Sequence, residues 1–207
     1  MTEADSRQFE AAVQSDMRRW LERAVIGLNL CPFAKAVHAR EQIHYAVSRA
    51  TTSQALAHDL VQELQDLVAL DPTLRDTTLL VAPDCLAEFL DFNDFLMIAD
   101  QALVDLALDG SIQIASFHPG FQFANTSAED ITNFTNRAPY PTLHLLREAS
   151  VDRAVKAFPQ AEFIFERNLQ TMERLGVVGW MALGLQRTAA SPAAGAPAGL
   201  PHVKIDP

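Results

Sequence analysis

Residues 77–82 read TTLLVA, an apolar run about as long as one strand. Such a run is typical of a strand that is buried on both faces of a sheet. Two further runs with strand character lie on either side of it along the chain, IHYAVS at residues 43–48 and IQIASF at residues 112–117. The middle of the chain therefore predicts three strands.

Helices are predicted between these strands. Leucines recur at helical spacing over residues 53–70, on one face: Leu56, Leu60, Leu64 and Leu67. A second long helix is expected over residues 86–108, with Gly110 as its C-terminal cap. Alternating strands and helices imply parallel strands joined by right-handed crossovers. The predicted fold class is α/β (or α+β), with a small three-stranded, mainly parallel sheet from a βαβαβ core, surrounded by N- and C-terminal helices.

Length and composition favour one domain. The chain has 207 residues, of which 49% are apolar, and no polar or Pro/Gly-rich linker interrupts residues 6–185. We predict a single globular α/β domain over residues 1–186. From Arg187 the sequence is rich in Ala, Pro and Gly without apolar periodicity, so residues 187–207 are predicted to be a disordered tail. The apolar segment 176–185 fits either a strand or a buried helix.

Charge and hydropathy argue against two classes of partner, nucleic acids and membranes. The net charge is -10 and basic residues form no run, so nucleic acid is not expected as a partner. No apolar run reaches the roughly 18–20 residues that span a bilayer, and the first residues carry no signal-peptide pattern. We expect a cytoplasmic protein without a membrane partner. In that compartment the two cysteines, Cys31 and Cys85, are expected to be free thiols.

The carboxyl ends of the strands are the expected location of a ligand site. The third end is the richest, because a long polar segment follows His118 and contains several aromatic side chains. Loops of that length are usually functional or disordered, and the aromatic residues argue against disorder. His118 fits a base or a metal ligand, and equally a histidine that hydrogen-bonds the backbone to hold the turn.

Cys31 precedes Pro32, which is preorganised for the first position of a helix. Cys31 is therefore the expected N-cap, where the helix dipole favours the thiolate. The alternative is an inert buried thiol between Leu30 and Phe33, which is the commoner role of a cysteine.

The segment NRAPYPTLHLLRE, residues 136–148, is the densest in polar and rigid residues. A helix is predicted to begin near Pro141, on which His144, Arg147 and Glu148 share one face at i, i+3 and i+4. They then present an acid/base, an anion-binding fork and a carboxylate. The alternative is a solvated face with a modest His–Glu pair.

Four segments, in this order, resemble the family catalogued as domain of unknown function 1415: WLERAVIGLNLCPFA, SFHPGFQFA, DITNFTNRAPYPTLHLLREASVDRAV and ERNLQTMERLGVVGW. They cover most of residues 18–182, and the resemblance implies no established activity. It implies that the family's motifs occupy Cys31, His118, Asp130, Asn133, Asn136, Arg137, Tyr140, His144, Arg147 and Glu148. Ala138 stands where the resemblance leads us to expect a serine.

Three functions are consistent with these residues. The first is an enzyme acting on a small anionic metabolite, with Cys31, His118 and His144 as catalytic residues. Its substrate-binding residues would be Asn133, Asn136, Arg137, Tyr140, Arg147 and Glu148. The second is a zinc or iron site drawn from Cys31, His118, His144 and Glu148, although Cys-x-x-Cys and His-Glu-x-x-His spacings are missing. The third is a non-catalytic module that binds a small molecule or peptide.

Cofactor and oligomeric state are not predicted by the sequence. The glycine patterns of dinucleotide-binding and P-loop folds are missing, so NAD or ATP binding of those kinds is not expected.

Overall fold

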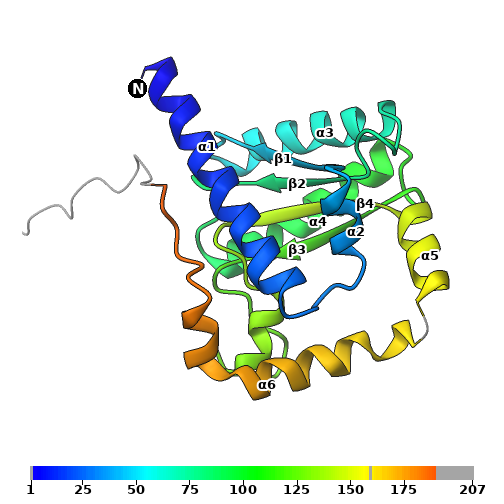
Figure 1. The fold of residues 1–207 in the computed structure, drawn as a ribbon. Helices are drawn as coiled ribbons and strands as arrows, with labels where there is room; N and C mark the ends of the chain where they lie inside the picture. The colour runs from blue at the N-terminus through cyan, green and yellow to red at the C-terminus, as the bar shows by residue number, and fades with distance from the viewer. Residues whose placement is uncertain (1, 159, 190–207) are drawn as a thin grey trace, which may run out of the picture.

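The computed structural model describes residues 2–158 and 160–189. Four strands form one sheet in the order β1-β2-β4-β3: β1 (Ile43–Val47), β2 (Thr77–Val81), β3 (Ile112–Phe117) and β4 (Thr142–Arg147). β1 and β2 pair in parallel, and β4 pairs antiparallel with both β2 and β3. The three predicted strands therefore run in one direction, but a fourth strand separates β2 from β3 (Figure 1). The α/β class is confirmed, and the three-stranded, mainly parallel sheet is corrected to a four-stranded mixed one.

β4 replaces the helix that was predicted to begin near Pro141. Leu143 and Leu145 are buried on the face that carries Leu80, so the segment alternates with a period of two. The slot between β2 and β3 satisfies the backbone groups of β4 on both edges, and this tertiary pairing overrides local helix preference. His144 and Arg147 consequently point to opposite faces of the sheet.

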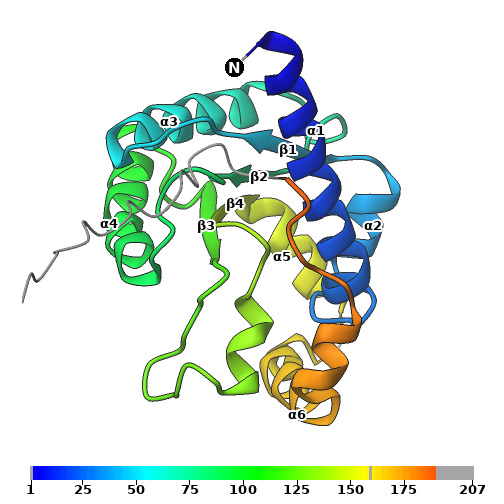
Figure 2. The same ribbon diagram turned by 90° about the vertical axis from the view of Figure 1, so that its left-hand side faces the viewer.

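Two helices cover one face of the sheet. α3 (Ser53–Ala69) and α4 (Phe89–Asp105) are the predicted crossover helices, and α3 buries all four leucines of its stripe. Figure 2 shows the sheet nearly edge-on, with α3 and α4 on one side and α1 (Glu3–Trp20) on the other. α1 continues through the π-helical turn η1 (Leu21–Ile26) and buries Val13, Met17 and Trp20. The sheet is thus a central layer between two helical layers.

The remaining helices surround this core. They are α2 (Ala34–Ala39), η2 (Ile131–Asn136), α5 (Glu148–Ala157), η3 (Ala161–Phe163) and α6 (Ile164–Ala182). α6 shows that residues 176–182 of the ambiguous segment 176–185 are helical, with a break at Gly176, whose φ of 62° suits glycine. Beyond the break, Trp180 packs edge-on against Phe134 of η2, with ring centroids 5.4 Å apart.

The segment 183–189, here called the strap, runs back along α1 (Figure 1). Arg23 donates to Leu183 O at 2.9 Å, and Arg19 donates to Gln186 O at 3.0 Å. The strap includes Arg187, Thr188 and Ala189, the first three residues of the predicted tail. Residues 190–207 of that tail lie outside the described residues. Within the described part of the chain, none of the helices has both the length and the apolar character needed to cross a membrane.

Candidate functional site

An open cleft of about 220 Å³ lies where the carboxyl end of β3 meets the amino end of β4. Most of its lining is apolar: Trp20, Pro119, Phe134, Ala138, Pro139, Trp180 and Leu185. The polar part consists of Arg137, Gln186 and Arg187. We call it the arginine cleft. Its position agrees with the expectation that ligands bind beyond the carboxyl ends of strands.

Arg137 follows η2 and is half-buried. Its Nε donates to Phe121 O at 3.2 Å, and its Nη2 donates to Ala128 O at 2.6 Å. The guanidinium carbon lies 4.0 Å from the centroid of the Phe134 ring. Burial lowers the pKa of Arg137, and Glu129 opposes this effect in part. These contacts fix the guanidinium but leave Nη1 without a partner among the described residues.

Arg187 reaches the cleft from the strap. Its Nε donates to Pro139 O, and its guanidinium carbon lies 4.6 Å from the centroid of the Tyr140 ring. The residue lies at the exposed rim, and partial burial of the guanidinium lowers its pKa, against the influence of Tyr140 and Asp16. Within residues 2–158 and 160–189, neither Arg137 nor Arg187 forms an ion pair with a carboxylate.

Asp16 is the nearby carboxylate, and it anchors the strap. It is fully buried and accepts hydrogen bonds from Tyr140 Oη at 2.8 Å and from Thr188 N and Oγ1, each at 2.7 Å. It also pairs with Arg19. Burial raises the pKa of Asp16, but the hydrogen bonds together outweigh burial, so its pKa lies below the usual value. Asp16 therefore stays ionised with its acceptor sites occupied.

His118 is buried, and both of its ring nitrogens are engaged. Nδ1 accepts from Gly120 N at 3.0 Å, which assigns the proton to Nε2, 3.0 Å from Leu86 O. Burial lowers the pKa of His118, so the neutral ring is favoured. These contacts fit the alternative in which His118 hydrogen-bonds the backbone and holds the turn after β3.

His144 is placed differently. It lies on the α1 side of the sheet, half-buried, with its ring centroid 6.2 Å from that of Phe117. Burial lowers the pKa of His144 to about 4, and no side-chain hydrogen bond to it occurs within the described residues. It does not line the arginine cleft. Phe117 contacts His144 and also Trp20, so it separates the histidine from the cleft wall.

Cys31 differs from the expected reactive thiol. α2 begins at Ala34 with Phe33 as its N-cap, so Cys31 lies before the cap. Burial raises the pKa of Cys31, and the backbone N–H groups of Phe33 and Ala34 offset only part of that effect. The expected N-cap position of Cys31 is therefore wrong, and its setting fits the alternative of a buried thiol. Cys31 is outside the cleft lining, and burial raises the pKa of Cys85 as well.

Two predicted substrate-binding residues support the long loop instead. Asn133 is fully buried and accepts from Phe123 N at 2.9 Å, while it donates to Ser127 O at 2.7 Å. Asn136 donates to Ser116 O at 3.3 Å. These bonds tie the loop to β3 and to itself, close behind the cleft.

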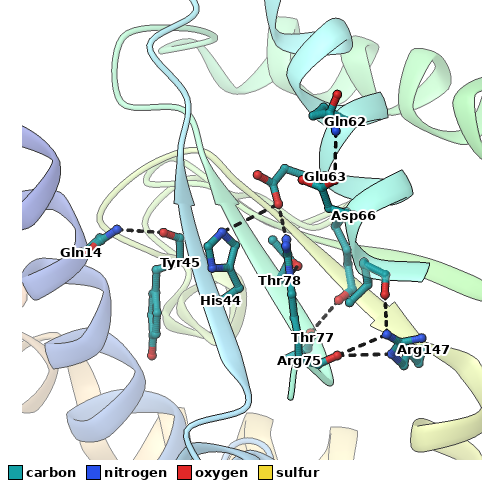
Figure 3. Close-up of polar contacts among 12 residues, drawn as sticks. Gln14, His44, Tyr45, Gln62, Glu63, Asp66, Arg75, Thr77, Thr78 and Arg147 are labelled. Atoms are coloured by element: carbon teal, nitrogen blue, oxygen red, sulfur yellow. Dashed lines mark hydrogen bonds and ion pairs between the residues drawn. The ribbon is translucent and has the colours of Figure 1, made fainter. Parts of the chain in front are cut away.

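The remaining predicted substrate-binding residues lie outside the cleft lining. Tyr140 is bound to Asp16, and burial raises its pKa. Arg147 donates to Leu67 O and Leu70 O at the end of α3. It also donates to Arg75 O, just before β2 (Figure 3). Glu148 begins α5 and donates its N–H to Ser111 O. Of the nine predicted site residues, only Arg137 lines the arginine cleft. The next residue, Ala138, where a serine was expected, lines it as well.

The sequence did not predict the other residues of the cleft, among them both tryptophans and Arg187. Trp20 was assigned to a helix core, Trp180 to an ambiguous apolar segment and Arg187 to the tail. One signal was available: the chain contains only two tryptophans, and both line this cleft.

A second polar cluster connects α3 to β1 and β2 (Figure 3). Arg75 is buried, pairs with Glu63 and donates its Nε to Thr78 Oγ1 at 2.9 Å. His44 lies beside it, with Nε2 at 3.9 Å from Glu63, and burial and then Arg75 lower its pKa. Since the charges pair with one another, this cluster needs no ligand to complete it.

Metal binding gains no geometric support. Among the described residues, His, Cys, Asp and Glu side chains nowhere gather in threes with the geometry of a metal site.

The fold and the cleft define a class: a mixed-sheet α/β protein with an arginine-lined, tryptophan-walled cleft at one end of its sheet. The chain belongs to the family described as "Protein of unknown function (DUF1415)", whose model matches residues 12–182. The match includes both tryptophans and Arg137 and ends before Arg187. Searches of curated proteins and of solved structures found no match.

Proposed function

We propose that the chain binds a small anionic molecule in the arginine cleft. The observation that carries this proposal is the pair Arg137 and Arg187. Backbone carbonyls and aromatic rings hold both guanidinium groups in place, and neither has a carboxylate partner in the described part of the chain. A partly buried charge is unfavourable until it is paired. A carboxylate or phosphate would supply that partner through charge-assisted hydrogen bonds.

The composition of the cleft favours binding over catalysis. Its lining includes no Cys, His, Asp, Glu or Ser among the described residues, and Cys31, His118 and His144 all lie outside it. Of the three expected functions, the small-molecule binding module therefore has the most geometric support. The proposed role of Arg137 is the one expected from the sequence.

The test is a calorimetric titration of the full chain with phosphate, succinate and benzoate, with tryptophan emission as a second readout. We expect saturable binding of at least one anion. Arg137→Gln and Arg187→Gln should each weaken it by about tenfold or more, since each removes a charged donor.

Arg153→Gln is the matched control, because Arg153 is exposed on α5 and outside the cleft. It should bind like the wild type. If no anion binds, or if the two cleft variants bind as the wild type does, the proposal is wrong.

A further inference from the structure

We infer that the ligand of the arginine cleft is a small aromatic carboxylate. This inference rests on the proposed function, and it names the chemical class of the bound anion. Two features carry it: the division of donors between the two arginines, and the aromatic walls.

The donors suit one planar, two-oxygen group. Arg187 uses only Nε for its own position, so both of its Nη nitrogens remain available, among the described residues, as an end-on pair. Such a pair matches the two oxygens of a carboxylate. Arg137 uses Nε and Nη2 on backbone carbonyls and has Nη1 left to add a donor. Among the described residues, the two arginines that line the cleft thus leave a fork on Arg187 and a single nitrogen on Arg137 for a ligand.

The rest of the lining suits a flat apolar body. Seven of the ten lining residues are apolar, and two of these are tryptophans. The indoles are already packed: Trp20 contacts Phe117 at 5.1 Å between centroids, and Trp180 contacts Phe134 at 5.4 Å. Preorganised walls lose little entropy when a ligand enters. Aromatic pairs also contribute beyond the apolar area that they bury.

The volume of the cleft suits a ligand with a single ring. An apolar cavity of about 150 Å³ holds benzene. The arginine cleft, at about 220 Å³, has room for one ring with its carboxylate and a small substituent. A nucleotide, with its sugar, base and phosphates, would extend beyond this volume through the open side of the cleft.

The test compares four probes on the full chain by calorimetry: benzoate, cyclohexanecarboxylate, benzamide and inorganic phosphate. Benzoate should bind about three- to tenfold more tightly than cyclohexanecarboxylate, which has the same charge and similar size without an aromatic ring. Benzamide lacks the charge and should bind at least about tenfold more weakly. Trp180→Leu should remove the preference for benzoate while cyclohexanecarboxylate still binds.

The outcomes separate the two proposals. If cyclohexanecarboxylate or phosphate binds as tightly as benzoate, the aromatic class is wrong while anion binding stands. If none of the three anions binds, the proposed function itself fails. Should Trp180→Leu not fold, the ratio between benzoate and cyclohexanecarboxylate on the wild type decides alone.

Discussion

Arg187 uses one guanidinium nitrogen to fix its own position and leaves two for a ligand. Arg137, inside the segment NRAPYP, uses two nitrogens for its own position and leaves one. Residue type and neighbouring prolines predicted that Arg137 would bind an anion. Nothing local predicted Arg187, because its position depends on Thr188 contacting Asp16, 172 residues away in sequence. His118 and His144 were both predicted to be catalytic, but they lie in different surroundings. Of the two, only His118 has hydrogen-bond partners for both ring nitrogens.

His144 should make stability depend on pH. The pKa of an unfolded histidine is about 6.5, whereas burial lowers the pKa of His144 to about 4 in the folded chain. Between these values the unfolded chain takes up a proton that the folded chain does not, so stability falls as the pH falls through this window. The expected loss is about 2 kcal/mol, allowing for partial exposure of the ring.

Urea unfolding at about pH 7 and about pH 4.5 measures this loss. His144→Phe should lose less stability over that interval than the wild type, because phenylalanine does not titrate. His58→Gln is the control, since the His58 side chain is 84% exposed. Equal losses in the wild type and His144→Phe would show that His144 is not buried in this way.

β4 is the element that sequence reasoning placed wrongly. Its leucines and its position after two prolines fit a helix entry. The strand is formed instead because the segment pairs with β2 and β3, which lie far away in sequence. The crossover helices were predictable because each carries a complete apolar stripe. The predicted helix placed Arg147 on a ligand-binding face. In the structure Arg147 instead binds carbonyls at the end of α3 and supports the fold.

Arg147→Met should therefore destabilise the chain without weakening anion binding. The substitution leaves carbonyls at the end of α3 without their charged donor, for a loss of about 1–3 kcal/mol. Arg147 pairs with Ile112 at the opposite end of the sheet from the cleft. Urea unfolding and a titration with benzoate measure the two effects, with exposed Arg174→Gln as the control. Weaker binding with unchanged stability would instead support a role for Arg147 as a ligand residue.

The strap should control affinity through Arg187. Thr188→Val removes the hydroxyl that donates to Asp16 Oδ1 and so loosens the segment that holds Arg187 over Tyr140. We expect the dissociation constant for benzoate to rise by about tenfold, since one charge-assisted hydrogen bond is lost. Thr51→Val, at an exposed position, is the control. Wild-type affinity in Thr188→Val would mean that the strap does not position the site.

At the scale of the whole molecule, the cleft is assembled from α1, the loop after β3, η2, α6 and the strap. The carboxyl end of α1 and the strap, which are far apart in sequence, therefore lie together at one end of the sheet. Periodicity and the alternation of strands and helices predicted the class of fold. They also pointed to the end of the sheet at which we propose the ligand site. They could not predict which side chains converge there, because that depends on how the terminal helices pack across the sheet.

A crystal structure of the full chain with 4-bromobenzoate tests the anion site most directly, because anomalous scattering locates the bromine. The ring is expected in the arginine cleft beside Trp180, with its carboxylate within hydrogen-bond distance of the Nη nitrogens of Arg187. A bromine position outside the cleft would contradict the proposed site, as would an empty cleft at a ligand concentration that saturates the protein in solution.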